Sequence, residues 1–147
     1  PDKHLIMTEA CQEKGAKMGE WNIGERYAAN IIRDLNNWTE GWIDWNLLLD
    51  TGGGPNHKEN FCSAPLIVSP AHDAILYQPS YYFLGHFSRY IDVGAQRLLC
   101  SNCSDSLLAT AFANPDGSVV AVVLNQSEHN LTYKIQRGGE AAAASAP

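Results

Sequence analysis

Apolar side chains recur at every fourth position over one stretch of the chain. The positions that share this spacing are Ile23, Tyr27, Ile31 and Leu35. Because an α-helix completes a turn in about 3.6 residues, side chains spaced in this way fall on one face. The pattern predicts a helix over residues 21–38 that buries this face.

An apolar run lies on each side of this predicted helix. The run from His4 to Cys11 carries Glu9 close to its end, and the run from Gly41 to Leu49 carries Trp45 and Asn46. Runs of this kind are typical of strands buried in a parallel sheet. In a parallel α/β barrel the carboxyl ends of the strands carry the chemistry, so we expect these three side chains at one edge. A carboxylate facing indole and amide groups is suited to bind a sugar ring.

The two tryptophans of the second run have different expected roles. Trp42 and Trp45 lie three positions apart. In a strand, side chains alternate between faces, so these two point to opposite sides of the sheet. We assign Trp45 to the pocket and Trp42 to packing.

The chain continues with a short apolar hairpin and a further helix. Residues 64–70 and 74–77 are apolar segments that predict a hairpin-like excursion. Pro79 follows at a position that the first turn of a helix tolerates, and it predicts a helix that extends to Ile91. Strand, helix, strand and helix in this order are typical of a parallel sheet wrapped by helices.

After Asp92 the pattern changes to short strands separated by turns. The predicted strands are residues 96–100, 107–113, 118–125 and 131–135. Asn114-Pro115-Asp116-Gly117 between two apolar runs predicts a hairpin, so this half is antiparallel. Four strands with one unmatched edge do not close a sandwich, so we expect a partner strand to be missing at the C-terminus, at the N-terminus of the parent chain, or at both. The alanine-rich end of the chain looks like an abrupt end after a turn.

Composition and charge narrow the classes of protein. The chain has 147 residues, is 45% hydrophobic and carries a formal net charge of −6. Lys and Arg are scattered, so the chain lacks the basic patch expected of a nucleic-acid-binding protein. No apolar run approaches the ~18 residues of a membrane-spanning helix. Both ends look cut rather than capped, which suggests a piece of a longer chain.

Cysteine and asparagine patterns bear on compartment and on metals. The four cysteines, Cys11, Cys62, Cys100 and Cys103, could form two bridges, although a chain of this length does not require a disulfide framework. Cys11 is expected as an unpaired, partly buried thiol, and the Cys100–Cys103 segment as a loop with free thiols or one local bridge. No second pair completes a four-thiolate site, and the five histidines show no metal-ligand spacing, so neither a metal nor a cofactor is expected. Four glycosylation sequons favour a secretory or lysosomal route, and they begin at Asn37, Asn102, Asn125 and Asn130.

Several motifs, in order along almost the whole chain, resemble the glucosylceramidases of glycoside hydrolase family 30. The motifs are Thr8-Glu9-Ala10-Cys11, Gly41-Trp42-Ile43-Asp44-Trp45-Asn46-Leu47, Gly53-Gly54-Pro55-Asn56, Asn60-Phe61, Tyr82-Phe83-Leu84-Gly85-His86-Phe87-Ser88 and Asn114-Pro115-Asp116-Gly117-Ser118. The resemblance implies an α/β part that is the C-terminal portion of a (β/α)8 TIM barrel, with strands 7 and 8 and their helices. An all-β part, a portion of an antiparallel β-sandwich, follows. The resemblance places the barrel part at residues 1–93 and the incomplete sandwich at residues 94–147.

The resemblance also implies roles for individual residues. Glu9 matches the catalytic nucleophile, and Trp45 with Asn46 matches a pair that lines the substrate site. Asn60 matches an asparagine near the bound sugar, and Cys11 matches a free thiol close to the nucleophile. The family's general acid/base glutamate has no counterpart here and is expected upstream of residue 1.

The function implied is retaining hydrolysis of glucosylceramide or another β-glucoside. A lipid-presenting activator protein and a membrane surface are further expected partners, and the compartment is lysosomal or secreted. Two alternatives stay open: a family 30 β-1,6-glucanase or other β-glycosidase, and a noncatalytic carbohydrate-binding module. Because general acid/base assistance contributes ~10²–10⁴-fold in rate, residues 1–147 alone are expected to be inactive.

Overall fold

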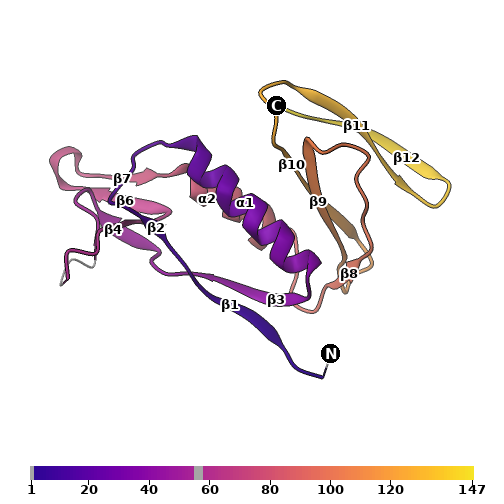
Figure 1. Ribbon diagram of the computed structural model, residues 1–147, viewed down its shortest axis with the longest axis horizontal. Coiled ribbons are helices and arrows are strands. Elements are labelled where there is room, and N and C mark those ends of the chain that lie inside the picture. The colour runs from indigo at the N-terminus through magenta and orange to yellow at the C-terminus, as the bar shows by residue number, and fades with distance from the viewer. Residues whose placement is uncertain (1, 55–57) are drawn as a thin grey trace.

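The computed structural model describes residues 2–54 and 58–147 (Figure 1). It contains two α-helices, one short 3-10 helix and twelve strands among these residues. In chain order these are β1 (Leu5–Ala10), β2 (Gln12–Glu13), α1 (Trp21–Asn36), β3 (Thr39–Asp44), β4 (Leu48–Asp50), β5 (Cys62–Ser63), β6 (Leu66–Ser69), η1 (Pro70–His72), β7 (Ala74–Tyr77), α2 (Pro79–Ser88), β8 (Gln96–Leu98), β9 (Leu107–Ala113), β10 (Val119–Asn125), β11 (Leu131–Arg137) and β12 (Glu140–Ala146). Neither α-helix is long and apolar enough to cross a membrane.

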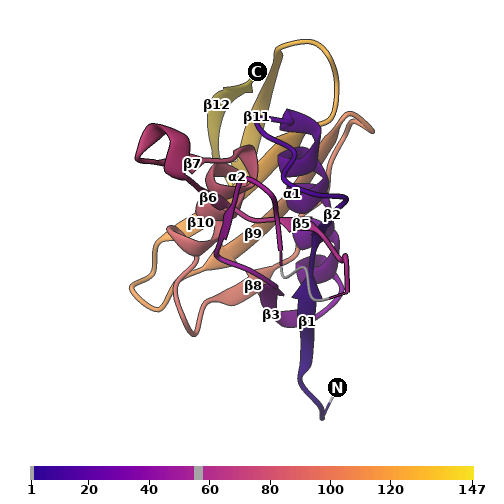
Figure 2. The same cartoon turned by 90° about the vertical axis from the view of Figure 1, so that its left-hand side faces the viewer.

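Helix α1 is the centre of the core. Its buried residues confirm the face predicted from fourfold spacing, and they include Ile23, Tyr27 and Ile31. The helix ends at Asn36, two residues before the predicted end. It packs against α2, β3, β9 and β10 (Figures 1 and 2). One apolar cluster therefore runs from the parallel strands to the antiparallel ones.

Strands β1 and β3 pair in parallel, and α1 lies between them in the sequence. The prediction of a buried first strand is wrong, because Leu5 and Ile6 are 47% and 54% exposed. Parallel strands are usually covered on both faces. Here β1 pairs only with β3 within the described residues, and α1 shields only its last residue, Ala10, which packs with Ile23 and Tyr27.

The apolar run predicted as one strand over residues 41–49 is two strands. β3 ends at Asp44, whose carboxylate Oδ1 accepts the Trp45 backbone N–H at 3.0 Å. The chain then leaves β1, and β4 pairs in parallel with β6. Trp45 and Asn46 therefore lie between the strands rather than within one.

The predicted hairpin and the second helix are confirmed, with a shorter helix. β6 and β7 pair antiparallel and are joined by η1, where Asp73 adopts a left-handed conformation with φ of 46°. Helix α2 begins at Pro79 and ends at Ser88, three residues before the predicted end.

The antiparallel half forms two sheets, β8–β9–β10 and β11–β12. The predicted Asn114–Gly117 turn joins β9 to β10, and Gly117 has the positive φ of 89° that this turn requires. The sequence analysis missed one strand, because the alanine-rich segment is strand β12 and pairs with β11. Small alanine side chains carry almost no periodic signal, but their backbone groups complete a ladder.

Asn125 ties the end of this half to β10. Its buried side-chain Nδ2 donates to the carbonyl oxygens of His129, at 2.7 Å, and of Pro147, at 3.0 Å. Among the four sequon asparagines, Asn37, Asn102 and Asn130 are exposed and Asn125 is not. The Asn125 sequon is therefore part of the packing in this fold.

Candidate active site

Two parallel strands bring the expected site segments to one edge. Ala10 at the end of β1 is in register with Asp44 at the end of β3, and the Trp45 N–H donates to the Ala10 carbonyl at 2.9 Å. Glu9 immediately precedes this junction, and Asn46 immediately follows it. The structure thus places the segments that carry Glu9, Cys11, Trp45 and Asn46 next to one another.

Glu9 is exposed and lines an open cavity of about 410 Å³. Cys11 and Trp42 line the same cavity, whereas Trp45, Asn46 and Asn60 are not among its lining residues. The backbone hydrogen bond between Trp45 and Ala10 places Trp45 next to the segment that carries Glu9, but Trp45 does not line this cavity. The assignment of Trp45 to a pocket stays a prediction.

Trp42 packs as predicted. Its indole meets the Tyr27 ring edge-on, with 5.2 Å between ring centroids, and its Nε1–H donates to the Asp34 carboxylate at 3.0 Å. This contact joins β3 to α1, so the strand that leads to the site is held from the helix side.

Asp44 is a further site residue that the sequence analysis did not single out. Besides the Trp45 N–H, its Oδ1 accepts the Tyr27 hydroxyl at 2.8 Å, and its Oδ2 is buried with no hydrogen bond to a described residue. Burial raises the pKa of the Asp44 carboxyl, and the two donors partly oppose that rise. The sequence did offer one sign of this role, because Asp44 is a carboxylate within an otherwise apolar run.

Asn46 and Asn60 differ in environment. Asn46 is half-buried, and its Nδ2 donor is buried without a partner among the described residues. Asn60 is exposed on the segment that leads into β5, where the next carbonyl, that of Phe61, accepts the Gly15 N–H at 2.9 Å. The Pro55 and Asn56 part of the expected loop motif lies outside the described residues.

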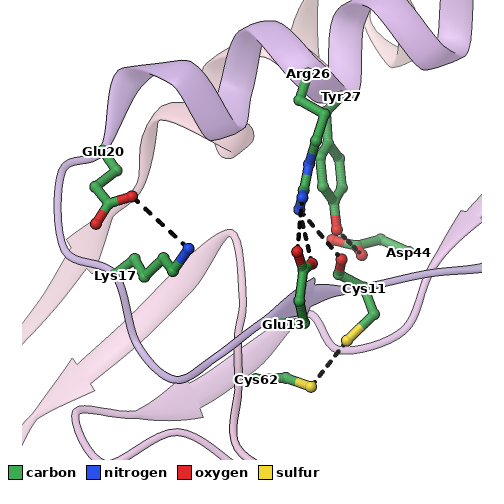
Figure 3. A network of polar contacts seen from close by, with 8 residues as sticks. All are labelled: Cys11, Glu13, Lys17, Glu20, Arg26, Tyr27, Asp44 and Cys62. Carbon is green, nitrogen blue, oxygen red and sulfur yellow. Dashed lines mark hydrogen bonds and ion pairs between the residues drawn. The ribbon is translucent and has the colours of Figure 1, made fainter.

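An ion pair supports the segment that follows Glu9 (Figure 3). The Arg26 guanidinium donates to both oxygens of Glu13, at 2.8 and 2.9 Å. This pairing lowers the pKa of Glu13 from 4.5 to about 2. Arg26 also reaches the Cys11 carbonyl at 3.5 Å, so α1 contacts the chain directly beyond β1.

Cys11 meets a second thiol that the sequence did not connect with it. Its Sγ lies 2.8 Å from the Sγ of Cys62 on β5 (Figure 3). All four cysteines of the chain are free thiols in the structure. Over residues 2–54 and 58–147, no group of three or more His, Cys, Asp or Glu side chains is arranged to hold a metal ion.

Comparison with known protein families identifies the family of this chain. The family model for the glycosyl hydrolase family 30 TIM-barrel domain matches residues 1–91, and that for the family 30 beta sandwich domain matches residues 94–147. The chain belongs to glycoside hydrolase family 30. The predicted fold class, the C-terminal part of a TIM barrel followed by β-sandwich strands, is confirmed.

The chain is similar to glycosidases that are named for different substrates. The chain is 41% identical to the lysosomal acid glucosylceramidase of Mus musculus over 141 residues, which are 92% of this chain and 27% of that protein. It is 27% identical to an endo-1,6-beta-D-glucanase of Trichoderma harzianum, over 85% of this chain and 26% of that one.

A solved structure matches the whole chain. The crystal structure of SrfJ from Salmonella typhimurium superposes with a TM-score of 0.94 and 34% identity, covering 100% of this chain and 33% of SrfJ. The chain spans about a quarter of the length of the curated relatives it matches.

Proposed function

We propose that this chain carries the nucleophile side of the active site of a retaining β-glucosidase of the glucosylceramidase type, with Glu9 as nucleophile. The observation that carries the proposal is the junction of β1 and β3. There the Trp45 N–H bonds to the Ala10 carbonyl and sets Glu9 at the carboxyl end of a parallel strand pair. The identity of 41% to the mouse lysosomal acid glucosylceramidase supports glucosylceramide as substrate.

Retaining hydrolysis requires two carboxyl groups ~5 Å apart. Glu9, as a carboxylate, attacks the anomeric carbon, and a protonated second carboxyl gives its proton to the leaving oxygen. Water then hydrolyses the glycosyl-enzyme with the second group acting as base. Glu13 is unsuited to be the acid, because Arg26 holds its pKa at about 2.

We place the general acid outside residues 1–147, which span about a quarter of the length of their curated relatives, so that these residues alone have no appreciable glucosidase activity. Within the chain, Trp45, Asn46, Asn60 and Cys11 bind the sugar or border it. The position of Asn46 directly beyond the β1–β3 junction, at the same edge as Glu9, supports this role. The barrel part occupies residues 1–93 and the sandwich part residues 94–147.

Further proposals follow from the resemblance to the mouse enzyme. The protein acts in sphingolipid breakdown in the lysosome, with a membrane surface and a lipid-presenting activator protein as partners. Exposed sequon asparagines at three positions support a route through the secretory pathway.

The test compares the complete polypeptide that contains this chain with its Glu9→Gln variant. Turnover of an aryl β-glucoside is expected to fall on the order of 10⁶-fold, the scale seen when the covalent nucleophile of a hydrolase is removed. Glu128→Gln, at an exposed loop position, is the matched control and keeps its activity. A mechanism-based fluoroglucoside should label the peptide that contains Glu9, and label attached elsewhere contradicts the assignment.

A second candidate is a β-1,6-glucanase, favoured by the 27% identity to the Trichoderma harzianum enzyme. Turnover of glucosylceramide against a β-1,6-glucan, measured on the same polypeptide, separates the two substrates. If Glu9→Gln left hydrolysis unchanged on every substrate, a noncatalytic sugar-binding role for this segment would replace both.

A further inference from the structure

Two cysteines from distant parts of the chain meet beside the proposed site. The Sγ atoms of Cys11 and Cys62 are 2.8 Å apart, although the residues are separated by 51 positions (Figure 3). Both sulfurs are thiols. The chain therefore has a second candidate redox pair besides Cys100 and Cys103, whose spacing is typical of redox motifs.

The backbone around this pair is tightly held. β2 pairs antiparallel with β5, and Glu13 is directly opposite Cys62. On its other side, Cys62 exchanges two backbone hydrogen bonds with Gly54, at 3.3 and 3.2 Å. Gly53 has a φ of 79°, and a Cβ there would lie 2.6 Å from the Cys62 carbonyl oxygen. Cys62 is thus fixed between two neighbouring segments.

Closure of a bond between the two sulfurs needs little movement. A disulfide has an S–S length of about 2.05 Å, so the sulfurs at 2.8 Å must approach by about 0.8 Å. Cys62 is 1% exposed, whereas Cys11 is half-buried and lines the open cavity beside Glu9. Only Cys11 is accessible to a small reagent.

We propose that Cys11 and Cys62 are a redox site that a small-molecule disulfide, such as oxidised glutathione, converts to an intramolecular disulfide. The Cys11 thiolate attacks one sulfur of the reagent and displaces the first thiolate. Cys62, after losing its proton to solvent, attacks the Cys11 sulfur of the mixed disulfide and displaces the second. Two protein thiols are oxidised, and one reagent disulfide is reduced to two thiols.

The reaction is slow at neutral pH. Burial, then the neighbouring Cys62 thiol and the carboxylates of Asp44 and Glu13, raises the pKa of Cys11 to about 12. Few Cys11 side chains are thiolates under these conditions, and the thiolate is the attacking species. Once the mixed disulfide forms, the Cys62 sulfur is already in place, so the second step is intramolecular.

The bond would connect the two segments that carry proposed site residues. Glu9 lies two residues before Cys11, and Asn60 lies two residues before Cys62. This consequence rests on the proposed function. Because a displacement of about 1 Å can cost ~10²-fold in rate, we expect oxidation to lower kcat on a β-glucoside by up to that factor and reduction to restore it.

The experiment uses the complete polypeptide with Cys100→Ser and Cys103→Ser, two positions outside the proposed site. It is incubated with oxidised glutathione, alkylated, and mapped by mass spectrometry without reduction. The expected product is a peptide pair linked through Cys11 and Cys62, lighter by two hydrogen atoms and free of glutathione. In a further Cys62→Ser variant, glutathione should stay attached to Cys11.

Two mass results overturn the redox site: glutathione that persists on Cys11 while Cys62 is present, or both thiols fully alkylated after the incubation. The mass readout needs no enzyme activity, so it is independent of the proposed function. If the link forms and kcat is unchanged, the coupling to the site is refuted. If the link forms in a polypeptide that hydrolyses no glycoside before oxidation, the proposed function is refuted and the redox site stands.

Discussion

Tyr27→Phe tests how the carboxylate beside the site is held. The Tyr27 side chain is 2% exposed, and its hydroxyl donates to Asp44 Oδ1 at 2.8 Å. The substitution removes that donor and keeps the ring against Trp42. Asp44 then has only the Trp45 N–H as a donor among the described residues, because Oδ2 is already buried without a partner.

The expected loss follows from the charge of the acceptor. A hydrogen bond to an ionised group contributes ~1.5–3 kcal/mol, whereas one to a neutral group contributes ~0.5–1.5 kcal/mol. We therefore expect the free energy of unfolding to fall by about 2 kcal/mol near neutral pH. This is roughly a 30-fold change in the ratio of folded to unfolded protein.

The loss depends on pH with a defined sign. Burial raises the pKa of Asp44 above its unfolded value, so the folded state favours the protonated form and Asp44 costs stability as pH rises through that window. The Tyr27 hydroxyl bond lowers this pKa, so its removal raises it further. The cost of Tyr27→Phe is therefore larger near neutral pH than at a pH below the unfolded pKa of Asp44.

Urea unfolding of the complete polypeptide, followed by intrinsic fluorescence at both pH values, measures the two losses. Tyr82→Phe is the matched control, because its side chain is 52% exposed, and it should change stability by less than about 0.5 kcal/mol. An equal loss at both pH values, or a loss no larger than that of the control, would refute the role given to Asp44.

Two further predictions concern the helices and the ion pair. Gly24→Ala should lower stability by about 1–3 kcal/mol in the same assay, because a Cβ there would lie 2.3 Å from the Phe83 ring, while Gly85→Ala, with no described atom within 4 Å, should not. Glu13→Gln should cost under about 1 kcal/mol near neutral pH, as expected for a half-exposed ion pair with Arg26. Since the pKa of Glu13 is lowered to about 2, that difference should vanish as pH falls from about 4.5 to about 2, and a difference that persists in acid would contradict the assignment.

Local patterns predicted the elements whose burial is periodic. Helix α1 followed from apolar side chains at every fourth position, and the β9–β10 hairpin followed from the Asn114–Gly117 turn. Glu9 as a candidate followed from its position at the end of an apolar run. The same reasoning failed at β12, because a row of alanines has no alternation to detect.

The sequence by itself determined the two helices and the β9–β10 turn, and it singled out Glu9 at the end of an apolar run as a candidate site residue. Only the tertiary structure decided that Cys11 meets Cys62, that Asp44 accepts the Tyr27 hydroxyl, and that the chain turns away from β1 after Asp44. The physical reason is the separation along the sequence of the residues that interact. Periodic burial is a property of neighbouring residues, whereas a contact across 51 positions depends on the path and register of every strand between them.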